Sequence, residues 1–156
     1  MRRVLLMAAA LAIPVSGLSV VALNGGVAGA AAAKISCTTI SGTASGDITI
    51  SGCTGGNTGG SSKPTPATSL ETGGTIDWVS GSTTTFAAPT LKSVSAKKCP
   101  GYVKKGSNNP SAESAKGTVT ADSGDGLKVP GKYSGEVCIS SSGTITAYPG
   151  KDLTAT

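Results

Sequence analysis

The chain has 156 residues, of which 38% are hydrophobic, 3% aromatic and 13% charged, with 23 glycines, four cysteines and no histidine. This length favours a single domain, because domains usually contain about 100–150 residues. Leu, Ile and Val are too sparse for a helical bundle, whereas Gly, Ser and Thr are abundant. The lack of histidine excludes Ser-His-Asp and Cys-His nucleophilic machinery.

The first 30 residues have the pattern of a secretory signal peptide. A basic start at Arg2-Arg3 is followed by an apolar run over residues 4–13, and Ala28-Gly29-Ala30 fits the A-x-A cleavage rule. An uncleaved anchor is the alternative, because residues 4–33 carry no charge and are long enough to span a bilayer. A proline and several glycines weaken such a span. We therefore predict cleavage within residues 30–33 and no stable membrane span afterwards.

The predicted mature domain, residues 31–156, is weakly basic. It contains 11 lysines against eight acidic residues, a net charge of +3, and it has no arginine. Such a charge supports solubility and does not by itself indicate a partner. Arginine is the side chain best suited to bidentate phosphate recognition, so its absence predicts that nucleic acid is not a partner.

All four cysteines fall in the predicted mature domain, at Cys37, Cys53, Cys99 and Cys138. An even number of cysteines in a small exported domain predicts two disulfides, for which three pairings are possible. A zinc site would require close cysteine pairs or histidines, and the spacings of 16, 46 and 39 residues do not provide them. The cysteines therefore predict an oxidising compartment, secreted or extracellular, with possible retention at the cell envelope.

Local sequence favours one of the three pairings. Residues 34–41 and 47–53 have the composition of strands, and a Gly-rich turn joins them. A hairpin centred on Ser45 places Cys37 directly opposite Cys53, at a separation that a disulfide can bridge. The remaining cysteines would then form the second disulfide.

Further strands are predicted by short runs of β-branched residues between Gly, Ser, Asn and Pro. These runs are residues 74–79, 83–88, 91–96, 117–121, 136–140 and 144–148. They predict an all-β fold, a small antiparallel β-sandwich, with an antiparallel β-barrel as the alternative. Residues 54–71, rich in Gly, Ser, Thr and Pro, are predicted to be a surface loop. A second loop is expected over residues 105–116, with at most one helical turn at 111–115.

Strand alternation also assigns faces. It places Ile76 and Trp78 on one face of their strand and Asp77 on the other. In the same way, Val137 and Ile139 share a face that Cys138 does not.

Two acidic motifs are candidate sites. Asp77 beside Trp78 suggests a glycoside-cleaving carboxylate next to a sugar-stacking ring, but strand neighbours point to opposite faces, which favours a core tryptophan and a solvent-facing aspartate. Asp122 and Asp125 suggest a calcium loop, but the spacing departs from the EF-hand pattern and position 12 is Tyr133. An ordinary acidic turn is expected instead. We assign no catalytic residue, metal or cofactor, and expect a non-enzymatic protein.

The densest charge cluster is the segment KKCPGYVKK at residues 97–105. It is the sequence's candidate for surface binding, and an anionic cell-envelope polymer is the partner that its charge suits. The alternative is a solvated loop held by a disulfide. The candidate binding residues are Lys97, Lys98, Tyr102, Lys104 and Lys105.

The order of the short motifs resembles that of small secreted actinobacterial proteins with four cysteines. The motifs are I-x-I-S-G-C, G-x-I-x-W-x-x-G, K-C-P-G, G-T-V-T and V-C-I followed by G-x-I-T-x-x-P-G. The resemblance covers most of the predicted mature domain and implies export, two disulfides and an all-β fold. It implies no activity and no catalytic residue.

Together these observations predict a secreted or cell-envelope-associated, non-enzymatic protein that acts by surface binding. One alternative is a small-ligand carrier with an apolar cavity, for which Ile76, Trp78 and Phe86 are the candidate lining residues. The other is a glycan-active hydrolase, which would require two carboxylates converging in one cleft.

Overall fold

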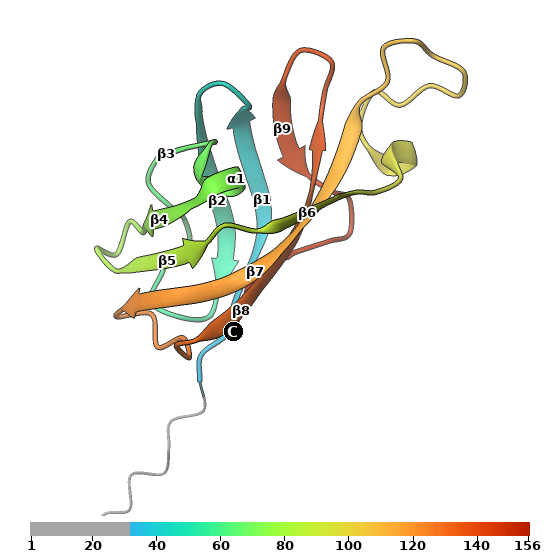
Figure 1. Ribbon diagram of the computed structural model, residues 1–156. Helices are drawn as coiled ribbons and strands as arrows, with labels where there is room; N and C mark the ends of the chain where they lie inside the picture. Colours follow the sequence, from blue (N-terminus) through green and yellow to red (C-terminus); the bar gives the residue numbers. More distant parts are fainter. Residues whose placement is uncertain (1–31) are drawn as a thin grey trace, which may run out of the picture. The chain divides into compact units, whose positions relative to one another are not determined.

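The computed structural model describes residues 32–156, and the predicted signal peptide lies outside them. Nearly all regular structure in this range is antiparallel β-strand (Figure 1). One short helix, α1 (Ser69–Thr72), and one 3-10 turn, η1 (Ala96–Lys98), interrupt it. The strands are β1 (Ile35–Thr43), β2 (Asp47–Thr54), β3 (Thr65–Pro66), β4 (Gly73–Asp77), β5 (Thr83–Ala87), β6 (Thr90–Ser93), β7 (Ser111–Ser123), β8 (Gly131–Ile139), β9 (Thr144–Ala147) and β10 (Leu153–Ala155).

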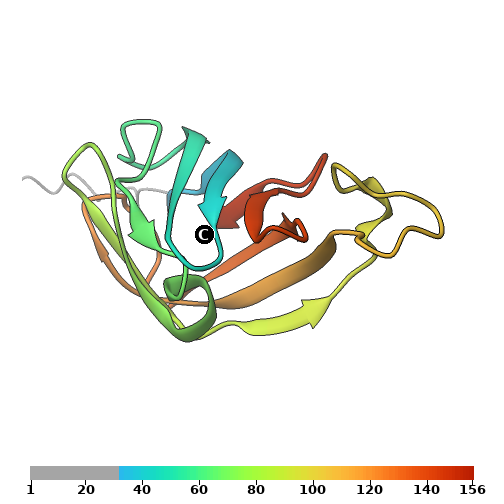
Figure 2. The ribbon, with the colours of Figure 1, turned by 90° about the horizontal axis from the view of Figure 1, so that it is seen from above.

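The strands form one hydrogen-bonded sheet in the order β3-β2-β1-β10-β8-β7-β5-β4. β6 pairs with β7, and β9 pairs with both β1 and β8. The sheet curves, so that β1 and β2 lie across from β6 and β7 when seen from above (Figure 2). The fold is therefore the antiparallel all-β domain that the sequence predicts.

The two ends of the sheet meet only through a short connecting segment. The Ser62 amide donates to the Ile50 carbonyl of β2 at 2.8 Å, and the Lys63 amide donates to the Asp77 carbonyl of β4 at 2.7 Å. These contacts belong to two isolated bridges and not to a continuous ladder. The sheet consequently folds over on itself like a sandwich and is not a regular barrel.

The predicted surface loop over residues 54–71 makes this connection. Thr58, Ser62, Thr65 and Ala67 are buried, and the segment contains β3. Most of the segment is exposed, as expected for a surface loop, whereas Ser62 and Lys63 bridge β2 and β4.

The first hairpin has the predicted register. Cys37 lies opposite Cys53, and these two cysteines form a disulfide. Cys99 and Cys138 form the other one. Both predicted pairings are confirmed, and no free cysteine remains among the described residues.

The main core lies between the folded halves of the sheet. Its buried members include Ile40 and Ile48 from the first hairpin and Val119 from β7. The predicted face assignment on β4 is confirmed, because Ile76 and Trp78 are buried whereas Asp77 is exposed.

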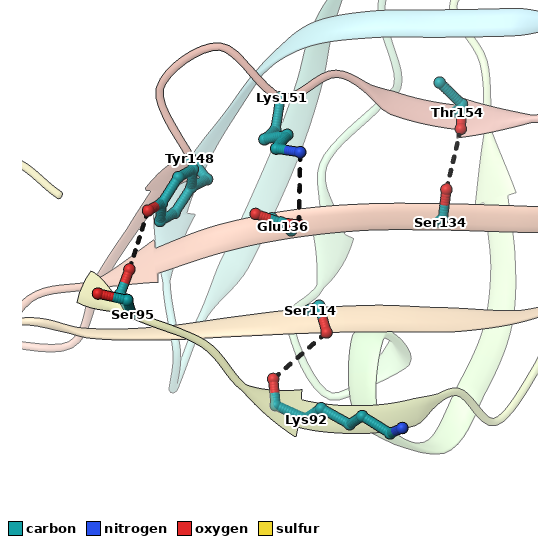
Figure 3. Close-up of polar contacts among 8 residues, drawn as sticks. All are labelled: Lys92, Ser95, Ser114, Ser134, Glu136, Tyr148, Lys151 and Thr154. Atoms are coloured by element: carbon teal, nitrogen blue, oxygen red, sulfur yellow. Dashed lines mark hydrogen bonds and ion pairs between the residues drawn. The ribbon is translucent and has the colours of Figure 1, made fainter. Parts of the chain in front are cut away.

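A smaller core lies on the opposite face of β7 and β8. Cys99, Cys138, Ala112 and Tyr148 are buried together there, as expected from the alternation around Cys138. The Tyr148 hydroxyl donates a 2.9 Å hydrogen bond to the Ser95 carbonyl (Figure 3). This contact and the disulfide hold the segment that follows β6 against the sheet.

The prediction of a loop over residues 105–116 is wrong for residues 111–116. β7 begins at Ser111 and runs for 13 residues, so residues 111–115 are strand and not a helical turn. The segment pairs with β8 on one edge and β6 on the other. Strand partners on both edges override a local composition of Ser, Ala, Glu and Lys that has little intrinsic strand preference.

Removal of either disulfide should destabilise the domain. The chain-entropy model gives a loss of about 3 kcal/mol for Cys37→Ser/Cys53→Ser and of about 4 kcal/mol for Cys99→Ser/Cys138→Ser. Urea denaturation of each double variant measures the loss, and far-UV circular dichroism checks that the fold is retained. A loss below about 1 kcal/mol for either variant would contradict a structural role for that disulfide.

Candidate functional site

The main feature of the domain is an apolar groove between the folded halves of the sheet. We call it the inner groove, and its cavity volume is about 140 Å³. Both halves of the sheet contribute aliphatic and aromatic side chains to its lining. The apolar lining includes Ile40, Ile48, Ile50, Ile76, Trp78, Phe86, Leu91, Val137, Ile139, Ile145 and Leu153. All three residues that the sequence offered as lining for a carrier, Ile76, Trp78 and Phe86, are among them.

The groove is open to solvent on the β6–β8 side. Leu91 of β6 is 40% exposed, and Val137 and Ile139 of β8 are only partly buried although they face inward. Large apolar side chains with such exposure retain contact with water that a filled core would remove. The interior is therefore incompletely packed at this end.

Two glycines leave room for large side chains on the groove wall. Gly117 pairs with Tyr133, and a Cβ at Gly117 would lie 2.5 Å from the Tyr133 ring. In the same way, a Cβ at Gly135 would collide with Leu153. Each large side chain thus lies over a glycine of the neighbouring strand, which lets it approach the sheet closely.

Tyr133 has a fixed orientation. Its ring meets Phe86 edge to face, with 4.9 Å between the ring centroids, and its hydroxyl donates to the Ala87 carbonyl at 2.8 Å. Burial raises the pKa of the Tyr133 phenol above its ordinary value. The ring therefore provides a neutral, ordered part of the wall.

Trp78 is held by a buried polar network that sequence reasoning missed. Its Nε1 donates to Thr84 Oγ1 at 2.9 Å, and Thr84 Oγ1 donates to Asp125 Oδ2 at 2.7 Å. Ser82 Oγ donates to Asp125 Oδ1 at 2.6 Å. Asp125 is 3% exposed and follows β7, far from Trp78 in sequence. The only sequence signal for this network is that a buried indole N–H requires a hydrogen-bond acceptor. That signal does not identify which residue supplies the acceptor.

Asp122 lies beside this network. Its Oδ2 accepts the backbone N–H groups of Gly126 at 2.9 Å and Leu127 at 3.2 Å, whereas its Oδ1 is buried without a partner among the described residues. Burial, and then the nearby Asp125 carboxylate, raise the pKa of Asp122. The motif considered as a calcium loop is an acidic turn in which the two carboxylates bind hydroxyl and amide hydrogens. No group of three or more metal-ligating side chains occurs in residues 32–156.

The lysine cluster lies at the opposite end of the domain from β4 and β5 (Figures 1 and 2). Lys97 and Lys98 end η1, and Lys104 and Lys105 lie in the loop that follows it. All four are exposed, and none forms an ion pair within the described part of the chain. Tyr102 is half-buried beside them.

The loop that carries these lysines is fixed at its base. The Asn109 side chain accepts the Val103 amide N–H at 2.7 Å and donates to the Val103 carbonyl at 2.9 Å. Together with the Cys99 disulfide, these hydrogen bonds limit the conformations that the loop can adopt.

Comparisons with known proteins return no match: no protein-family model, no curated protein and no solved structure resembles the chain closely enough to count. No helix within residues 32–156 is long and apolar enough to cross a membrane.

Asp122 should give the domain a specific pH dependence. A carboxyl group whose pKa is raised on folding, here from 3.8, binds protons more tightly in the folded state. Its contribution to stability is therefore complete below pH 3.8 and is lost as the pH rises through the folded pKa. Asp122→Asn lacks this loss, so its stability relative to the wild type should increase with pH through that window.

Urea denaturation of both proteins from pH 3 to pH 7 measures the difference. Asp77→Asn, on the exposed face of β4, is the matched control for removal of one acidic charge. A relative stability of Asp122→Asn that falls with rising pH would have the wrong sign for a desolvated carboxylate.

Proposed function

We propose that the protein is an exported, non-enzymatic binding protein that takes a small apolar group into the inner groove. The observation that carries this proposal is the solvent-open apolar lining contributed by both halves of the sheet. A fully packed core would leave no space for a ligand and would contradict the carrier hypothesis. The interior of this domain contains a groove instead. Burial of apolar surface from both partners would supply the free energy of binding.

The size of the groove limits the ligand. An engineered apolar cavity of about 150 Å³ accommodates benzene. The inner groove, at about 140 Å³, accordingly fits one ring or a short branched alkyl group. We infer that a larger ligand would leave its remainder in the open part of the groove.

Export is the second part of the proposal. It is supported by the signal-peptide pattern of residues 1–30 and by the two disulfides, which form and persist in oxidising compartments. The non-enzymatic assignment is supported by the lack of histidine and by a site whose lining is predominantly apolar.

Filling the groove should weaken the binding of a one-ring probe. Ala115 lines the groove on β7, and Ala115→Leu adds three carbons to that face. We expect fluorobenzene to bind the wild type and to bind this variant about tenfold more weakly, because the added side chain occupies the ring's space. The measurements are ¹⁹F NMR titration and fluorescence of Trp78, the single tryptophan of the chain.

Thr118→Leu is the matched control, since Thr118 is an exposed residue of the same strand and does not line the groove. It should leave the affinity within about twofold of the wild type. Absence of fluorobenzene binding to the wild type would overturn the proposed function.

A second candidate function is attachment to an anionic cell-envelope polymer through Lys97, Lys98, Lys104 and Lys105. The observation that favours it is that these four exposed lysines, without an ion pair among the described residues, lie on η1 and the adjoining loop, whose base is fixed. A fixed loop loses less conformational freedom on binding than a free one. Tyr102 would contribute apolar contact beside the charges.

This candidate predicts salt-dependent binding. The wild type should bind immobilised teichoic acid at low ionic strength and release it as salt screens the charges. A variant with all four lysines replaced by Gln should lose this binding, whereas Lys34→Gln/Lys63→Gln/Lys128→Gln/Lys132→Gln, which removes four exposed lysines elsewhere, should retain it. Equal binding by the two quadruple variants would attribute retention to net charge and refute a specific loop site.

A further inference from the structure

We infer that the inner groove selects ligands whose apolar group carries a cationic head, such as an arylalkylamine or an alkylamine. This inference rests on the proposed function and adds the charge of the ligand to it. The groove provides the binding surface, and the charged residues of its lining determine which head group is tolerated.

The charged residues of the lining are all acidic. Glu71 and Glu113 are the only charged side chains among the described residues that line the groove. The described chain contains 11 lysines, and none of them lines it. In a domain with an excess of basic residues, this local reversal of sign gives the groove a charge opposite to that of the molecule as a whole.

Glu113 has a fixed place on the sheet. It is paired with Val137 in the β7–β8 ladder and precedes Ala115 on the same face, so it belongs to the inward set of β7. It is partly buried, and it forms no ion pair within the described residues. Glu71 comes from a different element, α1, and is exposed and likewise without an ion pair there.

The next acidic residue on this part of the sheet behaves differently. Glu136 of β8 lies on the opposite face from Val137, and its Oε1 is 3.9 Å from Lys151 Nζ (Figure 3). The outward carboxylate, Glu136, thus has a cationic partner within the described chain, whereas the inward carboxylate, Glu113, does not. A cationic ligand head would supply the partner that Glu113 lacks.

Physical chemistry sets the direction of the preference. A charge beside apolar walls is screened less than one in bulk water, so a nearby carboxylate attracts a cationic head and repels an anionic one. At the separation of a head group from a groove lining, and with surface-like screening, each carboxylate changes the ratio of cationic to anionic ligand affinity by about fivefold. The preference should decrease in high salt, where the Debye length falls to about 3 Å.

A matched series of one-ring probes tests the inference. Benzylamine, benzyl alcohol and benzoate share one ring and one carbon beyond it, and they differ in head-group charge at pH 7. We expect benzylamine to bind about 25-fold more tightly than benzoate, with benzyl alcohol between them. Trp78 fluorescence and isothermal titration calorimetry, each at low and high salt, measure the affinities.

Glu113→Gln and Glu71→Gln keep the size of the side chain and remove its charge. Each should reduce the ratio of benzylamine to benzoate affinity by about fivefold and leave benzyl alcohol binding nearly unchanged. Glu136→Gln is the control on the outer face, and its ratio should match that of the wild type.

The outcomes separate the two proposals. Equal binding of all three probes would overturn the charge preference and leave the proposed function standing, whereas binding of none would overturn both. An apparent affinity that falls as the protein concentration rises would place a second copy of the chain in the groove and also overturn the inference. A benzylamine preference that Glu113→Gln and Glu71→Gln both leave unchanged would contradict the assigned residues.

Discussion

The antiparallel pairing of β7 with β8 is the contact on which the other features of the domain depend. Its ladder runs from Ser111 opposite Ile139 to Val119 opposite Gly131. Because side chains alternate along a strand, this one register sends Val137 into the groove and Cys138 into the small outer core. The same pair of strands thus supplies part of the groove wall and also Cys138, whose disulfide anchors the segment that carries the lysine cluster. A shift of one residue in the register would exchange the two faces.

The groove exists because the domain has few large side chains with which to fill its interior. Aromatic residues are 3% of the chain, and glycines lie opposite Tyr133 and beside Leu153 on the inner face. Interiors normally pack as densely as organic crystals, so an apolar lining that stays open forgoes contact energy. Two disulfides compensate by reducing the entropy of the unfolded chain. A lightly packed sheet that is cross-linked by two disulfides can therefore retain an open groove, which a small domain without disulfides would have to fill.

Buried polar groups give this lightly packed interior a defined geometry. Asp125 accepts hydroxyls from Ser82 and Thr84, and Thr84 in turn accepts the Trp78 indole N–H. Hydrogen bonds from two directions hold the carboxylate, which lowers the penalty of burying it. The orientation of Trp78 is consequently fixed by a directional hydrogen bond as well as by packing. This matters for binding, because a wall that is already ordered loses little entropy when a ligand arrives.

Local sequence determined the features that depend on neighbours along the chain. The hairpin around Ser45 set the Cys37–Cys53 pairing, and alternation placed Trp78 on the apolar face opposite Asp77 and Cys138 on the face opposite Val137. Only the tertiary structure decided that residues 111–116 are strand, that Asp125 is buried and that the interior holds a groove with Glu113 on its lining. Each of these depends on partners far away in sequence, and composition does not reveal which strands will meet or how much space they will leave between them.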